Sequence, residues 1–77
     1  MATEFNYRVV KEVATISDFG GETKELNLIS YNDKPPKYDL RTWKSEGGNR
    51  IMCRGITLHK EEAKRLRDAL IKELEEE

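Results

Sequence analysis

The sequence has little that could brace a small fold covalently. Cys53 is the only cysteine and His59 the only histidine among 77 residues, so neither a disulfide nor a zinc site with several Cys and His ligands is available. A chain of this size buries only part of its surface and is marginally stable alone. We therefore expect one domain spanning residues 1–77, pairing with a second copy of itself, and no metal or other cofactor.

Long apolar runs are also missing. The N-terminus, Met1 to Asn6, has neither the basic region nor the apolar stretch of a secretory signal peptide. No other segment is apolar over the length that spans a membrane. The single unpaired cysteine suits a reducing compartment. We therefore expect a cytoplasmic protein without a membrane partner, with association with the nucleoid as a further expectation.

A net charge of −1 lacks the basic excess typical of proteins that bind nucleic acids, but the charge is unevenly distributed. Residues 34–60 hold seven Lys or Arg and two acidic residues, whereas residues 1–33 and residues 61–77 each have a balance of −3. Because a partner responds to the local field, the central segment indicates an anionic partner. Ordinary solvated surface is the alternative in a chain with 38% charged residues.

Alternating apolar residues and turn residues predict four strands. The expected strands are Tyr7–Ser17, Thr23–Tyr31, Lys37–Lys44 and Arg50–Ile56. Two of the connections contain Gly-Gly, which favours tight turns, and the third contains two prolines, which cannot sit inside a ladder. Short connections make neighbouring strands antiparallel, so we expect a four-stranded meander.

Two positions predict local irregularity in these strands. Adjacent Val9 and Val10 suggest a bulge or a strand buried on both faces. Gly55 suggests a bulge or the close approach of another backbone.

The segment after the fourth strand predicts one amphipathic helix. Ala63, Leu66, Leu70 and Leu74 recur at helical spacing, and His59 is a weak N-cap with no full capping box. The fold class is therefore α+β, with the order ββββα. One short helix covers only part of one sheet face, so we expect the helix and a sheet edge to pair with a second copy.

The third strand carries the most informative pattern. Alternation places Lys37, Asp39, Arg41 and Trp43 on one face of the strand. Cations alternating with a flat aromatic ring are suited to binding a phosphate backbone and stacking unpaired bases. Tyr31, which ends the preceding strand beside the basic loop, is the second candidate for stacking.

Each of these residues also has a plainer interpretation. The alternation favours an exposed Trp43, and packing of its ring under the helix or in a dimer interface is the alternative. Arg41 could pair with Asp39 instead of phosphate, although exposed pairs contribute only about 0–1 kcal/mol. Cys53 is expected to be a small buried residue, because a nucleophilic pair with His59 lacks a third orienting group. We expect no enzymatic activity.

The order of motifs is similar to that of a known family. Asp39-Leu-Arg-Thr-Trp43, a turn with glycines, Arg54-Gly-Ile-Thr-Leu58 and a Glu-rich helix resemble the single-stranded-DNA-binding domain of the transcriptional coactivator positive cofactor four (p15). The stretches Lys24–Asn32 and Pro35–Asp39 look most like the small stand-alone bacterial members. The resemblance spans about residues 23–74.

This resemblance implies a strongly curved antiparallel sheet and a homodimer formed through the C-terminal helix and the last strand. It also implies single-stranded DNA lying across the concave sheet surfaces of both subunits. The family positions that carry over are Tyr31, Arg41, Trp43 and Arg54.

Together, the pattern and the resemblance predict a homodimeric single-stranded-DNA-binding protein with little sequence preference, serving as a transcription or DNA-maintenance accessory factor. The predicted binding residues are two stacking aromatics and six cations: Tyr31, Trp43, Lys34, Lys37, Arg41, Lys44, Arg50 and Arg54. Two alternatives stay open. The same face could bind another protein, or it could bind RNA, because nothing in the sequence reports on a 2′-hydroxyl.

Overall fold

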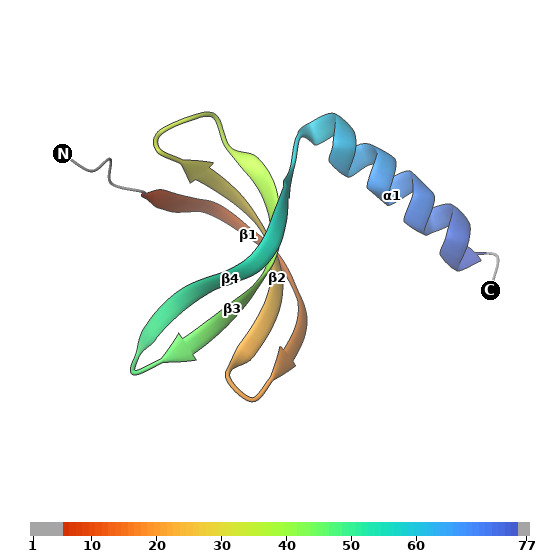
Figure 1. Ribbon diagram of the computed structural model, residues 1–77. Helices are drawn as coiled ribbons and strands as arrows, with labels where there is room; N and C mark the ends of the chain where they lie inside the picture. Colours follow the sequence, from red (N-terminus) through yellow and green to blue (C-terminus); the bar gives the residue numbers. More distant parts are fainter. Residues whose placement is uncertain (1–5, 76–77) are drawn as a thin grey trace.

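The computed structural model describes residues 6–75 as one antiparallel sheet followed by one helix (Figure 1). The elements are β1 (Tyr7–Phe19), β2 (Glu22–Tyr31), β3 (Lys37–Glu46), β4 (Asn49–Leu58) and α1 (Lys60–Glu75). The strands lie in the order β1-β2-β3-β4, so the predicted ββββα meander is confirmed. The stretch Met1 to Phe5, which carries most of the expectation about a signal peptide, lies outside the described residues.

The three connections turn where the sequence predicts. Gly20-Gly21 and Gly47-Gly48 form tight hairpin turns, and all four glycines have positive φ, from 51° to 92°. This conformation is accessible to glycine at little cost and matches the twist of the flanking strands. The loop at residues 32–36 is closed by a hydrogen bond of 2.9 Å from the Lys34 N–H to the Tyr31 carbonyl.

Strand β1 is irregular along its whole length. Its pairing with β2 shifts register between Val9 and Lys11, between Glu12 and Ala14, and between Thr15 and Ser17. The bulge predicted at Val9-Val10 is confirmed, and the other two were not predicted. Each bulge bends the strand and increases its twist. The sheet is accordingly strongly curved, and its hairpin loops bend away from α1 (Figure 1); the face turned away from α1 is the concave face.

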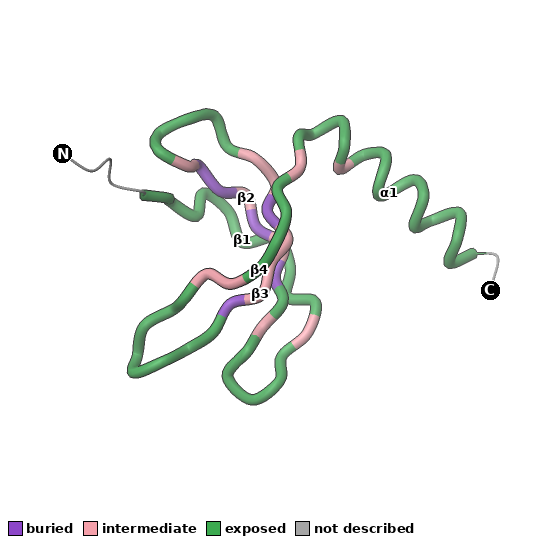
Figure 2. Tube along the Cα trace, in the orientation of Figure 1, coloured by how far each residue is buried: buried purple, intermediate pink, exposed green. Residues whose placement is uncertain are grey.

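The core is small and largely polar. Among the described residues, the buried apolar side chains are Ile29 and Trp43, whereas Glu25, Asn27, Ser30 and Asp39 are buried polar residues. These positions lie on β2 and β3 (Figure 2). Glu25, Asn27 and Asp39 therefore form a buried, hydrogen-bonded polar layer on the concave face, where a thick hydrophobic core is absent.

The convex face meets α1 across an apolar groove of about 400 Å³. The groove is lined by Leu26, Tyr38 and Leu58 of the sheet and by Ala63, Leu66, Arg67, Leu70, Ile71 and Leu74 of the helix. The helical side chains Leu66, Leu70 and Leu74 remain 39% to 59% exposed. The helix therefore offers an apolar stripe that its own sheet does not cover.

Gly55 lies where β3 and β4 shift register. It is the cross-strand partner of Arg41, and the register shift falls between Arg41 and Trp43. A Cβ atom on Gly55 would lie 2.0 Å from the Cβ of Arg41, a separation that no packed structure tolerates. Both interpretations of Gly55, a bulge and a close approach of the neighbouring strand, are confirmed.

Helix α1 begins with half of a capping box. The Glu62 carboxylate accepts a hydrogen bond of 2.8 Å from the N–H of His59, which precedes the first helical residue. The His59 carbonyl accepts the first intrahelical bond, from Ala63, at 2.9 Å. Within residues 6–75, α1 is too short and too polar to cross a membrane.

Candidate nucleic-acid interface

Cross-strand pairing assembles the concave face from three strands. Lys37, Asp39, Arg41 and Trp43 of β3 are partners of Ile29, Asn27, Glu25 and Thr23 of β2. Residues directly opposite one another in an antiparallel pair share a face, so the predicted alternation of β3 is confirmed. On the outer side of β2, Tyr7 is the partner of Tyr31, which adds β1 to the same face.

Trp43 lies in the floor of this face and not on its surface. Its exposed fraction is 2%, because the Tyr7 ring lies 5.8 Å from it between centroids and the Arg50 guanidinium lies 4.6 Å above its centroid. The indole N–H meets no acceptor among the described residues. The expectation of an exposed Trp43 is therefore wrong, since neighbours from β1 and β4 cover the ring. Its proposed role in stacking stays a prediction.

Tyr31, Asp39 and Arg41 form a hydrogen-bonded cluster beside Trp43. The fully buried Asp39 carboxylate accepts two bonds from the Arg41 guanidinium, at 2.6 and 2.7 Å, and another from the Tyr31 hydroxyl. Arg41 also donates to the Cys53 carbonyl at 2.9 Å and to the Tyr31 oxygen at 3.2 Å. The pairing of Arg41 with Asp39 that the sequence left as an alternative is thus present, and it is buried.

The cluster shifts the pKa of Tyr31 and of Arg41. Burial, reinforced by the hydrogen bond to Asp39, raises the pKa of Tyr31 to about 12. The hydrogen bonds to Asp39 raise the pKa of Arg41. At neutral pH Tyr31 is neutral and Arg41 is a cation whose charge is balanced by Asp39. Arg41 is therefore held rigidly in the floor of the face, with most of its donors engaged.

A second cluster surrounds Glu25. Its carboxylate accepts hydrogen bonds from Thr23 at 2.5 Å and Asn27 at 3.3 Å, and it pairs with Arg50 at 2.5 Å. Burial alone would raise the pKa of Glu25, but these hydrogen bonds and the charge of Arg50 outweigh it and lower the pKa. The ionised Glu25 holds the half-exposed Arg50 side chain over the Trp43 ring.

The other predicted cations are distributed around the face. Lys37 is half-buried on the concave face, and Lys34 and Arg54 are exposed in the loop at 32–36 and next to the β4 bulge. Lys44 follows Trp43 in an unbroken strand segment, so it lies on the opposite face. Strand alternation therefore separates Lys44 from Trp43, and the predicted role of Lys44 in the DNA-backbone track stays a prediction.

Three residues of this face were not predicted as site residues from the sequence: Tyr7, Glu12 and Glu25. If β1 paired with β2 in regular register from the Gly20-Gly21 turn onward, Tyr7 would lie opposite Lys34. The three bulges in β1 shift the register, so that Tyr7 lies opposite Tyr31. The adjacent valines signalled only the first of those bulges. Glu25 carried a signal, since alternation of β2 puts it on the face of Tyr31.

The curved meander, the trailing helix and the polar, aromatic concave face define a small ββββα domain with one open sheet face. The chain belongs to the Transcriptional Coactivator p15 (PC4) family, whose model matches residues 19–69. A protein of Treponema pallidum (strain Nichols), described as uncharacterized, is 40% identical over 68 residues, which are 87% of this chain and 78% of that protein. The family predicted from the motifs is confirmed.

Family membership bears on the function in general terms. The family is a non-enzymatic one whose members bind single-stranded DNA. The structure adds no sign of a metal centre: within residues 6–75 there is no group of three or more His, Cys, Asp or Glu placed to hold an ion. The concave face instead presents hydrogen-bonding groups, cations and aromatic rings, which suit a nucleic-acid ligand.

Proposed function

We propose that the protein is a homodimer that binds single-stranded DNA with little sequence preference through its concave face. The observation that carries the proposal is the aromatic cluster of Tyr7, Tyr31 and Trp43, set between Arg41 and Arg50 on a curved, open sheet. The general property of the family supports it. In this proposal the protein is a cytoplasmic, nucleoid-associated accessory factor in transcription or DNA maintenance.

Burial of Trp43 changes which groups meet the bases first. Tyr7 is 37% exposed, and the half-exposed Arg50 guanidinium presents a flat cation directly above the indole. Unpaired bases stack on both aromatic rings and guanidinium planes. Trp43 then supports the stack from below, and Tyr7 and Arg50 form its upper surface.

Phosphate contacts fall to the cations that lack a carboxylate partner. Arg41 and Arg50 are balanced by Asp39 and Glu25. Lys37, by contrast, has no ion pair within the part of the chain that the structure describes. We therefore assign the salt-dependent part of the affinity first to Lys37, with Lys34 in the neighbouring loop extending the track.

Two matched lysine variants test this assignment. Lys37→Gln should weaken binding to an oligothymidine and lower the slope of log affinity against log salt by about one, because one counterion fewer is released. Lys44→Gln removes the same charge from the opposite face and should leave the slope nearly unchanged. The measurement is fluorescence anisotropy at four or more salt concentrations. Equal slopes for the two variants would contradict a concave-face track.

An exposed apolar stripe on α1, on the convex side of the sheet, supports the proposed homodimer. Leu66, Leu70 and Leu74 are exposed along the groove of about 400 Å³ between sheet and helix. A domain with so few buried apolar side chains gains stability by covering such a stripe. A second copy of α1 is the occupant that we propose, since an isologous contact matches an apolar stripe with its own counterpart.

A further inference from the structure

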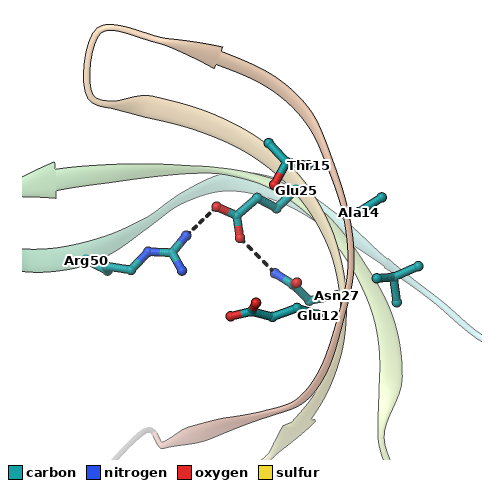
Figure 3. Close-up of a pocket in the computed structure, with 7 residues that line it drawn as sticks. Glu12, Ala14, Thr15, Glu25, Asn27 and Arg50 are labelled. Atoms are coloured by element: carbon teal, nitrogen blue, oxygen red, sulfur yellow. Dashed lines mark hydrogen bonds and ion pairs between the residues drawn. The ribbon is translucent and has the colours of Figure 1, made fainter.

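A polar pocket lies on the concave face beside the aromatic cluster. It has a volume of about 350 Å³ and is lined by Glu12, Val13, Ala14 and Thr15 of β1, Glu25 and Asn27 of β2, and Arg50 of β4. In Figure 3, the β1 and β2 strands curve around this hollow, and the side chains of Glu12, Glu25, Asn27 and Arg50 point into it from three strands. Its size is that of a small-ligand site.

The hydrogen-bonding groups of the pocket are unequally occupied. Glu25 is engaged by Thr23, Asn27 and Arg50. Glu12 is exposed, and its carboxylate has no hydrogen bond or ion pair with any residue in the range 6–75. Arg50 uses one N–H group on Glu25, and a guanidinium has five. The pocket therefore offers a free bidentate acceptor on one side and free donors on the other.

Among the four bases, guanine matches this arrangement best. Its Watson–Crick edge carries two adjacent donors, N1–H and N2–H, followed by the acceptor O6. A carboxylate accepts both donors at once, whereas adenine, cytosine and thymine each place an acceptor next to their donor and would repel it. Single-stranded bases are commonly recognised at this edge while they stack on aromatic or guanidinium planes.

We infer that this pocket accepts one guanine of the bound strand, with Glu12 accepting from its N1–H and N2–H groups and Arg50 donating to its O6. The inference rests on the proposed single-stranded-DNA binding and deepens it. Stacking and phosphate contacts remain indifferent to sequence at the other positions. Arg50 links the two parts of the site, because it lines the pocket and lies over Trp43.

The test compares oligothymidines that differ at one central nucleotide. The protein can shift along the strand to place that nucleotide in the pocket. An oligothymidine with one deoxyguanosine should bind about 5- to 100-fold more tightly than the uniform oligothymidine, as expected for one bidentate contact to a base. Deoxyinosine, which lacks the 2-amino group, should lose most of this gain, and deoxyadenosine should show none.

Two matched variants locate the preference. Glu12→Gln replaces the bidentate acceptor by an amide with one acceptor and one donor group, so the guanine preference, the ratio of the affinities for the two oligonucleotides, should fall to nearly one. Glu22→Gln removes the same charge outside the pocket, so the preference should persist. Each variant is checked by circular dichroism and thermal unfolding, and Glu12→Asp, which keeps a carboxylate, should retain part of the preference.

The outcomes separate this inference from the proposed function. Equal affinity for all the oligonucleotides, with oligothymidine still bound, would overturn the guanine pocket and leave single-stranded-DNA binding standing. A guanine preference that survives in Glu12→Gln would also overturn it. Absence of binding to every oligonucleotide at low salt would overturn both proposals.

Discussion

Asp39 is the residue that organises the concave face. It is fully buried, and its carboxylate accepts from both Arg41 and Tyr31. A buried carboxylate is tolerated only when it is paired and hydrogen-bonded. Here the partners are the guanidinium of Arg41 and the hydroxyl of Tyr31. Asp39 orients both, so one side chain fixes the positions of two predicted binding residues.

Asp39→Asn should lower the free energy of unfolding by about 3–5 kcal/mol, because it leaves the Arg41 charge without its buried counterion. Asp68→Asn is the matched control, since Asp68 pairs with Arg67 on the exposed surface of α1. That variant should change stability by about 0–1 kcal/mol. Urea unfolding followed by circular dichroism measures both, and similar losses in the two variants would contradict the role of Asp39.

The raised pKa of Tyr31, about 12 against an ordinary value of 10.0, predicts a loss of stability at high pH. A tyrosine whose pKa is higher in the folded state stabilises the fold fully below pH 10, and this contribution disappears as the pH rises toward 12. The stability advantage of the native protein over Tyr31→Phe should therefore shrink between pH 10 and 12. An absorbance titration in which Tyr31 of the folded protein ionises near pH 10 would exclude this account.

Strand alternation was sufficient to predict which side chains of β3 lie on the concave face, but not which of them water reaches. Asp39, Arg41 and Trp43 follow from a period of two within β3. The burial of Trp43 depends on Tyr7 and Arg50, which are 36 positions before it and 7 after it in the chain. Such contacts depend on strand register, and three bulges in β1 set that register.

At the scale of the elements, β1 shows how bulges create a new surface. Its register shifts bring Tyr7, Glu12 and Thr15 opposite Tyr31, Asn27 and Glu25. Regular alternation would send Glu12 and Thr15 to opposite faces of the sheet, so the bulges are what place both in the pocket. Within β1, only adjacent Val9 and Val10 predicted a bulge from the sequence, because the other two extra residues interrupt no visible pattern.

The apolar stripe of helix α1 is predicted to form the dimer interface. Leu70→Glu places a charge in the exposed apolar stripe and should shift the protein from dimer to monomer, because a buried unpaired carboxylate is strongly unfavourable. Arg65→Gln changes the net charge by the same amount on the opposite side of the helix and should leave the dimer intact. Light scattering after size-exclusion chromatography, over a range of concentrations, measures the mass. A Leu70→Glu protein that remains dimeric would place the interface elsewhere.

At the scale of the whole molecule, composition and size anticipated the weakness of the core. The absence of disulfide and zinc ligands suggested that a second copy completes the fold. The structure shows a polar layer on the concave side and an uncovered helical stripe on the convex side. These two faces have different chemistry, which allows one to bind a partner copy while the other stays open to nucleic acid.

The basic excess of residues 34–60 overstates the number of cations that are free of a carboxylate partner. Arg41 and Arg50, two of its seven cations, are neutralised by Asp39 and Glu25. In the proposed function, these two residues contribute rigid geometry and flat guanidinium surface, and the attraction of phosphate depends on the cations without a carboxylate partner, Lys37 first. The sequence offered the pairing of Arg41 with Asp39 as an alternative, but it did not indicate that of Arg50, because Glu25 lies outside the basic segment.

The proposed function requires the concave face to bind unpaired DNA. The most direct measurement is the anisotropy of a labelled oligothymidine titrated with the protein at two salt concentrations, with a duplex of the same length as competitor. We predict tight binding that weakens as salt rises, that the duplex does not displace, and that changes the fluorescence of Trp43. Absence of binding at low salt, or displacement by the duplex at equal concentration, would contradict the claim.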